Sequence, residues 1–438
     1  MTAPMDLIRE IWFLKRDIVS DDYDRALARL AEEVPMTIHE VATGTRVWTW
    51  TVPEKWTCHE AYLETLDGRR LLDHKEHPLH IVSYSLPFEG QVTRDELFQH
   101  LHTHAHLREA VPFVFKYYQR DWGLCSSQEF KESLTDDAYR VVIKTDFSPG
   151  SLKIGEVVVP GEVEDCFVVA AHLDHPAMAN DDLTGVVVGL EAARRMLSQT
   201  RPHFTYRFLF FPETLGSIAY LSRYEHLIPR MRGGLFLEML GNDSPHALQT
   251  SFQPESATDV CLVSAFKDLS KGAYVGTYRS IIDNDERQFN SPGVRVPMLS
   301  LSRVENPHLP ESRFAPYPEY HSSLDTPDIV SAERLQESVD LVVGLINAFD
   351  RNRYVVNHFK GEVFASGIGI WVDYREDPIR HKLMFEIMER FDGSRRPADV
   401  ARELNVPFQT VWELAEKLLE KKLVSLIDFP RPSDPHLK

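Results

Sequence analysis

The spacing of apolar residues changes along the chain and predicts segments of different architecture. Residues 5–33 carry apolar side chains at intervals of three and four, as amphipathic helices do, with Asp21 or Asp22 placed to cap the second helix. From 38 to 125 the apolar runs are short and rich in β-branched and aromatic residues, as in VWTWTV and LHIVSYSL. We expect 38–125 to form a small β-rich unit.

Strand-like and helix-like patterns alternate from about residue 126 to 350. CFVVAAHL, TYRFLFFP, GGLFLEML and VPMLSLSR are typical of buried strands, and TGVVVGLEAARRMLSQ and SAERLQESVDLVVGLINAFD are typical of helices. This alternation predicts an α/β fold in which a mostly parallel mixed sheet is sandwiched by helices. The main domain would then be discontinuous, comprising 1–37 and 126–350, with the β-rich unit inserted into it.

Residues 375–438 are predicted to form a further unit. Three helical patterns, HKLMFEIMERFDG, PADVARELN and PFQTVWELAEKLLEKK, precede the apolar run LVSLID, an order that resembles a winged helix. The third pattern holds three glutamates among three lysines, whereas phosphate contact needs a net basic face. We therefore expect this unit to serve packing or dimerisation, and the protein to be a homo-oligomer.

Composition narrows the classes of partner. The formal net charge of −18 makes nucleic acid and anionic membranes poor default partners. The N-terminal residues lack the apolar core of a signal peptide, and no apolar run approaches the length of a membrane span. The four cysteines form no CxxC pair, so neither a zinc ribbon nor a disulfide framework is predicted. These features indicate a soluble cytoplasmic protein.

The densest group of ionisable residues is AAHLDHPAMANDDLTG, residues 170–185. It holds two histidines and three aspartates between the apolar runs CFVV and VVVGL. Charges at such a seam between buried elements cost free energy unless they are paired. A metal ion is the pairing partner that this mixture of imidazole and carboxylate predicts.

Other candidate ligands follow later strand-like runs. A pair of zinc ions roughly 3.5–4 Å apart requires a bridging carboxylate and further ligands held on rigid strand ends. The candidates are His172, Asp181, Glu213, Glu238 and His321, with Asp174 placed to orient His172. Two Zn²⁺, three carboxylates and a bound hydroxide would together be neutral, which suits a half-buried pocket.

Five motifs in order, HLDH, NDDLTG, PETLGS, LEM and YHSSLDT, resemble those of the di-zinc aminopeptidase family. That family includes bacterial leucyl aminopeptidases and the related glutaminyl cyclases. The resemblance implies a zinc exopeptidase-like fold and one or two zinc ions. It also implies that His172 and Glu238 bind one zinc, that Asp181 bridges, that His321 binds the second zinc, and that Asp174 is the orienting aspartate. The whole chain further resembles bacterial aminopeptidase-like proteins with a β-rich insert and a C-terminal winged helix.

The chain departs from this family pattern at one position. The family has two adjacent glutamates, a general base and a zinc ligand, whereas Pro212-Glu213-Thr214 offers only one. Glu213 is therefore a candidate for either role. His175 competes with His172 as a ligand, and Asp182 competes with Asp181 as the bridge. Either aspartate is also suited to cap the helix that follows.

Two further clusters have competing interpretations. Asp285, Glu286 and Arg287 precede a strand and are candidates for substrate binding, a carboxylate for an ammonium or the arginine for a carboxylate; the alternative is a set of salt bridges in a loop. The histidine run at 100–106 has helical spacing, and we interpret it as a solvated helix face.

Two functions from different classes follow. The first is a zinc-dependent aminopeptidase or amidohydrolase that cleaves an amide next to a free amino group, in a peptide or small-molecule substrate, with Glu213 as general base. The second is a catalytically altered aminopeptidase-like protein that binds or regulates. The missing second glutamate favours the second function, and the complete set of other ligands favours the first.

Overall fold

The structure, a computed structural model, describes residues 2–270, 274–305 and 315–430. The chain divides into two compact units, the first comprising 1–252 and 276–340 and the second comprising 253–275 and 341–438. Among the described residues, no helix is both long enough and apolar enough to cross a membrane.

The first unit begins with the two predicted helices. They are α1 (Pro4–Ile11) and α2 (Asp21–Ala31). The cap of α2 is Ser20 rather than Asp21 or Asp22, because the Ser20 side chain accepts a hydrogen bond from the Tyr23 amide. Both aspartates lie in the first turn, where their negative charges interact favourably with the positive end of the helix dipole.

A large mixed sheet forms the core of this unit, in the order β1-β10-β12-β11-β13-β16-β14-β15. Its strands are β1 (Thr37–Ala42), β10 (Ser151–Val159), β11 (Cys166–His172), β12 (Thr205–Phe211), β13 (Met231–Glu238), β14 (His246–Gln249), β15 (Tyr274–Gly276) and β16 (Met298–Arg303). The predicted α/β fold with a mixed sheet is confirmed. The pairs β12-β11, β11-β13 and β13-β16 are parallel, and antiparallel pairs flank them.

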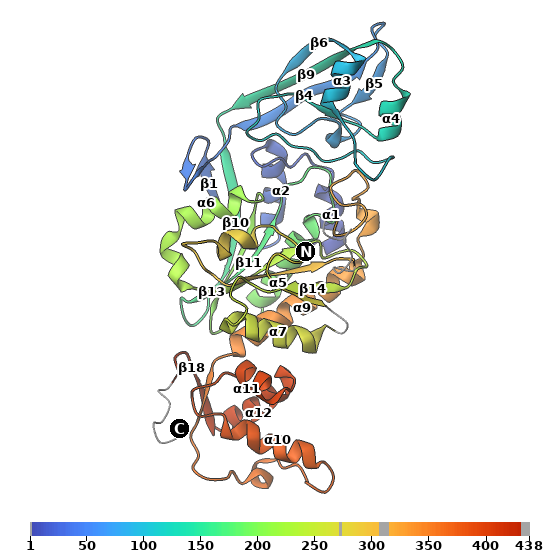
Figure 1. Cartoon of the computed structure of the whole chain (residues 1–438). Coiled ribbons are helices and arrows are strands. Elements are labelled where there is room, and N and C mark those ends of the chain that lie inside the picture. The colour runs from blue at the N-terminus through green and yellow to red at the C-terminus, as the bar shows by residue number, and fades with distance from the viewer. Residues whose placement is uncertain (1, 271–273, 306–314, 431–438) are drawn as a thin grey trace. The chain divides into compact units, whose positions relative to one another are not determined.

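Helices follow the strands, as the alternating pattern predicts. They are α5 (Leu183–Leu197), α6 (Leu215–Arg223), η2 (Glu225–Arg230), α8 (Glu286–Asn290), η4 (Pro327–Ile329) and α9 (Ala332–Arg351). Helix α5 packs on β11 and β13 (Figure 1). Both faces of the apolar strand segment CFVVAA are buried, which explains why it shows no alternation of polar and apolar residues.

The β-rich region forms its own antiparallel sheet, in the order β5-β4-β9-β6. The elements are β2 (Arg46–Val47), β3 (Trp50–Thr51), β4 (Lys55–Glu64), β5 (Arg70–Asp73), η1 (Pro78–His80), β6 (Phe88–Thr93), α3 (Arg94–His100), β7 (Leu101–His102), β8 (Leu124–Cys125), α4 (Gln128–Ser133) and β9 (Ala138–Ser148). The limits differ from the predicted 38–125. Strand β1 pairs with β10 of the large sheet, and β9 lies beyond 125. A strand pattern does not reveal which sheet the strand joins.

The histidine run is not one helix face. Helix α3 ends at His100, whose ring stacks on Trp122 with 4.0 Å between centroids. The next two residues form β7, and His104 lies in a loop. The aromatic stack and the pairing of β7 with β8 outweigh the helical spacing.

The second unit contains the predicted helices and strand in their predicted order. Its elements are α7 (Ala257–Leu269), β17 (Tyr354–Asn357), η5 (Ala365–Ile368), α10 (Pro378–Glu389), α11 (Pro397–Leu404), α12 (Phe408–Glu420) and β18 (Val424–Ile427). Strands β17 and β18 pair antiparallel, and α7 packs on α11 and α12. This unit is therefore larger than the predicted 375–438, because a distant helix and the residues from 341 onward join it.

Candidate metal centre

Three chain segments bring the first group of candidate ligands together. His172 is the last residue of β11, Glu238 is the last residue of β13, and Asp181 lies just before α5. Parallel neighbouring strands end at the same sheet edge, which is where α/β proteins place ligands. The His172 Nε2 atom lies 3.3 Å from Asp181 Oδ1 and 3.7 Å from Glu238 Oε1.

A second group surrounds the other oxygen of Asp181. His175 Nδ1 lies 3.1 Å from Asp181 Oδ2, and His321 Nε2 lies 3.0 Å from the same oxygen. The other ring nitrogen of His175 lies 3.2 Å from Glu213 Oε2. Ligand atoms of His172, His175 and Asp181 all lie within 4.8 Å of one another. Asp181 Oδ1 therefore faces one imidazole, and Asp181 Oδ2 faces two.

Many nitrogen and oxygen atoms of this cluster are buried and make no hydrogen bond, although several lie 3.0–3.3 Å from one another as ion pairs. They include His172 Nδ1 and Nε2, His175 Nδ1, His321 Nε2, both carboxylate oxygens of Asp181, and Glu238 Oε2. Buried polar atoms in native proteins are nearly always satisfied, so such a concentration requires an explanation. A chemically consistent explanation is a metal ion, because imidazole and carboxylate are ligands that zinc prefers.

The electrostatics of the cluster also suit a cation. Burial lowers the pKa of His175, but the neighbouring Asp181 and Glu213 carboxylates outweigh it and raise that pKa to about 10. Burial raises the pKa of Glu213, but His175 outweighs it and lowers that pKa to about 2. These two shifts show that the site favours positive charge beside the Asp181 and Glu213 carboxylates. A metal ion would supply this positive charge.

The geometry distinguishes between the alternative ligands that the sequence left open. The Asp182 Oδ1 atom accepts hydrogen bonds from the amides of Gly185 and Met239, at 3.0 and 2.8 Å. Asp182 caps α5. His172 and His175 do not exclude one another, since they face different oxygens of Asp181.

Asp174 lies behind the cluster. Its Oδ1 atom lies 3.5 Å from His172 Nδ1 and accepts a hydrogen bond of 2.7 Å from the Glu213 amide. Asp174 thus contacts both a candidate ligand and the segment that carries the candidate base.

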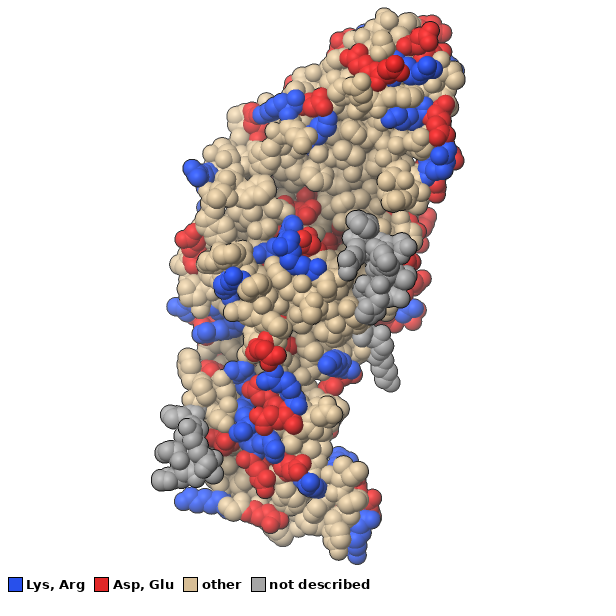
Figure 2. Space-filling model, in the orientation of Figure 1, with Lys and Arg blue, Asp and Glu red and all other residues tan. Residues whose placement is uncertain are grey.

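The predicted substrate-binding trio has mixed exposure. Asp285 and Glu286 are fully buried. Asp285 accepts hydrogen bonds from the Thr214 amide and the Ser217 hydroxyl, and burial next to Glu213 raises the pKa of Asp285 to about 7. Glu286 accepts hydrogen bonds from Gln249 and Asn284. Arg287 is 29% exposed, and its Nε donates to the Asn284 carbonyl. Acidic side chains lie at the base of a hollow in the first unit, with Lys and Arg side chains at its rim (Figure 2).

Backbone conformation at the cluster is unusual. His175, Thr214, Met239 and His321 have φ of 89°, 58°, 56° and 53° without being glycine. Such conformations cost free energy and persist where the surrounding structure imposes them, often at functional sites. All four lie at or next to candidate ligands or the candidate base.

Two residues to which the sequence interpretation gave no role hold the loop that carries His175 and Asp181. Arg16 is completely buried and donates to the carbonyl oxygens of Leu173, His175 and Met178, at 2.9, 2.7 and 2.9 Å. Asp325 accepts from the amides of residues 179, 180 and 181, and from the Tyr317 hydroxyl. A single arginine in an amphipathic helical pattern gives no such signal, and Asp325 lies in the YHSSLDT motif, next to a candidate ligand.

We expect Arg16→Met to destabilise the first unit and to weaken metal binding. The change leaves buried carbonyls without donors and removes a cation facing Asp174, at a cost of about 3 kcal/mol or more. Thermal unfolding should begin about 5–10 °C lower, and zinc content should fall. Arg25→Met, at an exposed arginine of the same unit, is the control. Equal melting temperatures and zinc contents for the two variants would contradict this role.

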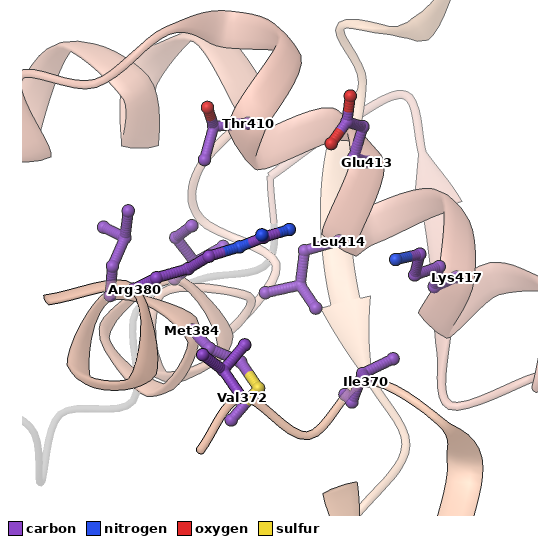
Figure 3. A pocket seen from close by; sticks show the side chains of 10 residues that line it. Ile370, Val372, Arg380, Met384, Thr410, Glu413, Leu414 and Lys417 are labelled. Carbon is purple, nitrogen blue, oxygen red and sulfur yellow. The ribbon is translucent and has the colours of Figure 1, made fainter. Parts of the chain in front are cut away.

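A separate hollow lies within the second unit, between α10 and α12 (Figure 3). Its floor is apolar, with Ile370, Met384 and Leu414, and Arg380 and Lys417 lie at its sides (Figure 3). Glu413 is the acidic residue of its lining, which contains no histidine. This hollow therefore lacks the set of residues that a metal centre needs.

The strand order, the parallel strand ends and the imidazole–carboxylate cluster define an aminopeptidase-like α/β protein. Residues 5–352 match the family described as a domain of unknown function, DUF4910, and the chain belongs to that family. A Clostridium acetobutylicum protein named for polysaccharide biosynthesis and an aminopeptidase-like domain is 30% identical over 426 residues, covering 96% of each chain.

Solved structures agree with this assignment. A crystal structure named for a peptidase, from Clostridium acetobutylicum, has a TM-score of 0.85 at 30% identity and covers 97% of this chain and 96% of its own. A zinc aminopeptidase of Bacillus subtilis has a TM-score of 0.58 at 17% identity, covering 78% of this chain and 93% of its own. The predicted resemblance to the zinc aminopeptidases is confirmed, and at this low identity the Bacillus structure supports the fold alone.

Proposed function

We propose that the protein is a zinc-dependent hydrolase of aminopeptidase type, which cleaves an amide next to a free amino group in a peptide or small-molecule substrate. The observation that carries this proposal is the concentration of buried imidazole and carboxylate atoms around both oxygens of Asp181, which are in ion-pair contact but make no hydrogen bonds. A purely structural cluster would be expected to satisfy these atoms with hydrogen bonds.

The proposed ligand sets are nearly symmetrical about Asp181. His172, Glu238 and Asp181 would hold one ion, and His175, His321 and Asp181 would hold the other. His175 thus takes the place of the second glutamate of the aminopeptidase pattern. Two zinc ions, two ligand carboxylates, the Glu213 carboxylate and a hydroxide would together be neutral.

This ligand set leaves Glu213 as the general base. Zinc, when bound, lowers the pKa of water and polarises a carbonyl. The Glu213 side chain is 29% exposed, so its ionised carboxylate is accessible to a water molecule and to substrate. It takes a proton from the attacking water and passes it to the leaving amine. The His175 ring and the hydrogen bond from the Glu213 amide to Asp174 hold it in place.

Neighbouring residues position these groups. The Asp174 carboxylate lies next to the Nδ1 atom of His172 and orients that ring. A carboxylate behind a histidine ligand is a common arrangement around zinc. Asp285 holds the turn after Glu213 by binding the Thr214 amide and Ser217, so we assign it a positioning role rather than substrate contact. Glu286 is equally buried. Arg287 remains the candidate for contact with a substrate carboxylate.

We propose that residues 375–438, of which 431–438 lie outside the described residues, include a winged-helix-like part of the second unit, and that it serves packing in a cytoplasmic homo-oligomer rather than DNA binding. The support is the order of α10, α11, α12 and β18, together with glutamates along α12. A salt-sensitive, sequence-selective complex of the full chain with DNA would contradict this assignment.

Metal analysis tests the proposed function. Protein purified without a histidine tag should contain about two zinc ions per chain, and hydrolysis of a panel of aminoacyl 4-nitroanilides should stop on treatment with dipicolinate and return with zinc. Less than about a tenth of an equivalent of zinc, with no gain on addition, would favour the alternative, a binding or regulatory protein.

A further inference from the structure

An aromatic hollow in the first unit is not used by the proposed chemistry. It has a volume of about 290 Å³, near the lower end of the range of about 300–1,000 Å³ typical of small-molecule sites. Its lining includes Tyr84, Tyr117, Tyr118, Phe147, Glu54 and Arg120. Four aromatic rings with one ion pair form a surface suited to a flat ligand with a polar edge.

The rings of this hollow are held in place. The Tyr84 hydroxyl donates to the Glu54 carbonyl at 3.0 Å, and the Tyr118 hydroxyl donates to the Thr51 carbonyl at 2.7 Å. The Arg120 guanidinium lies over the Phe147 ring at 4.9 Å. Because its hydroxyl is engaged by the backbone, the exposed Tyr118 presents mainly its face and edge to a ligand, whereas Tyr84 is buried and supports the hollow from within.

A row of rings joins the hollow to the metal centre. The Phe113 ring lies 5.0 Å from the His175 ring and 5.6 Å from the His321 ring, centroid to centroid. Phe113 contacts Phe115 at 5.5 Å, and Phe115 stacks on Tyr117 at 4.6 Å. Four residues of extended chain span at most about 14 Å, which limits the distance from Phe113 to Tyr117.

Two further observations distinguish this row from an ordinary core. Phe113 is buried, but Phe115 in the row is 47% exposed and Tyr118 in the hollow is 52% exposed, although both are large and apolar. Large exposed apolar patches commonly mark binding sites. In addition, burial and then the charges of Asp174, Asp17 and Glu213 raise the pKa of Tyr117 well above its usual value.

We propose that this hollow binds the far end of the substrate whose amide lies at the metal centre, and that this end carries a flat-faced ring. An aromatic ring and a pyranose share the required chemistry, because each has an apolar face and can carry polar groups at its edge. The face stacks on Tyr117 and Tyr118, and the edge meets Arg120 and Glu54, which lie 3.2 Å apart.

The sequence separation of Phe113 and Tyr117 also bears on substrate length. A substrate chain of about four extended residues, or an equivalent spacer, is long enough to run along this row. This inference rests on the proposed function, because the metal centre fixes the bond that is cut.

Ligand binding to the metal-free full chain tests the hollow independently of hydrolysis. The probes are N-acetyltryptophan amide and tri-N-acetylchitotriose, titrated with saturation-transfer NMR. We expect one of them to bind, and which one binds identifies the type of ring. Tyr118→Ala and Arg120→Ala should each weaken binding about 3- to 10-fold, as expected for loss of one aromatic or cation–π contact. Tyr374→Ala, at a tyrosine 58% exposed in the second unit, should leave it unchanged.

Two results would overturn the proposal: failure of both probes to bind, or binding that neither Tyr118→Ala nor Arg120→Ala weakens. Loading with Co²⁺ then separates this proposal from the proposed function. Paramagnetic broadening of the bound probe would support continuity with the metal centre. Co²⁺ uptake without broadening would overturn that continuity, whereas absence of Co²⁺ uptake would contradict the metal centre and leave the ring site intact.

Discussion

Glu213→Gln should leave zinc near its original content while kcat falls by about 10²–10⁴-fold, the range expected for loss of general base catalysis. The amide keeps the shape of the carboxylate but cannot accept the proton of water. The proposed ligand set does not include Glu213, because His175 lies between Glu213 and Asp181. Zinc analysis and steady-state kinetics on one preparation would therefore separate the roles of base and ligand.

The matched control is Glu164→Gln, at a glutamate whose side chain is 78% exposed and pairs with Arg230. It removes the same charge from the chain without approaching the metal centre, so kcat should not change. Loss of one zinc ion from Glu213→Gln would make Glu213 a ligand and would contradict the role assigned to His175. Unchanged zinc and an unchanged rate would remove Glu213 from the mechanism.

The main fold could be predicted because its signals are local. Apolar runs such as CFVVAAHL and GGLFLEML are long enough to be buried strands, and the helices between them have clear spacing. Pairing between distant segments has no such signal. Strand β9 has the same composition whether it joins the small sheet or the large one, and nothing in the pattern of α7 shows that it packs on α11 and α12.

The candidate site shows the same division. Polar residues directly after buried strands predicted a cluster at the sheet edge, and the structure brings His172, Glu238 and Asp181 together there. The sequence left His175 as a competitor of His172, because spacing along a loop does not show which atom each ring faces. The loop turns at His175, whose φ is 89°. The His172 and His175 rings therefore reach Asp181 from different sides.

The residues that hold the loop are harder to find from sequence. Arg16 lies 157 positions from Leu173, the first carbonyl it binds, and only the folded chain shows that its guanidinium is buried. Nearby carboxylates, chiefly Asp174 and Asp325, favour a buried cation at Arg16, and the local sequence around Arg16 does not reveal them.

His175→Ala is the second change with a large expected effect. If His175 replaces the missing glutamate, this variant should hold about one zinc ion per chain instead of two, with the ion on His172 and Glu238 retained. Partners that only orient a ligand are worth about 10–100-fold in metal affinity or activity, so loss of a ligand should lower kcat/KM by more than about 10²-fold. The measurements are zinc stoichiometry and kcat/KM, together with circular dichroism to show an intact fold.

His321→Ala should give the same stoichiometry, because His321 faces the same oxygen of Asp181, and His59→Ala should behave as the unchanged protein, because His59 is exposed and pairs with Asp146. Agreement between His175→Ala and His321→Ala, with both ions still bound in Glu213→Gln, would identify the second ligand set. If His175→Ala keeps two ions while Glu213→Gln loses one, the family's glutamate ligand is retained at Glu213. The base would then have to be sought among other groups that reach the scissile amide.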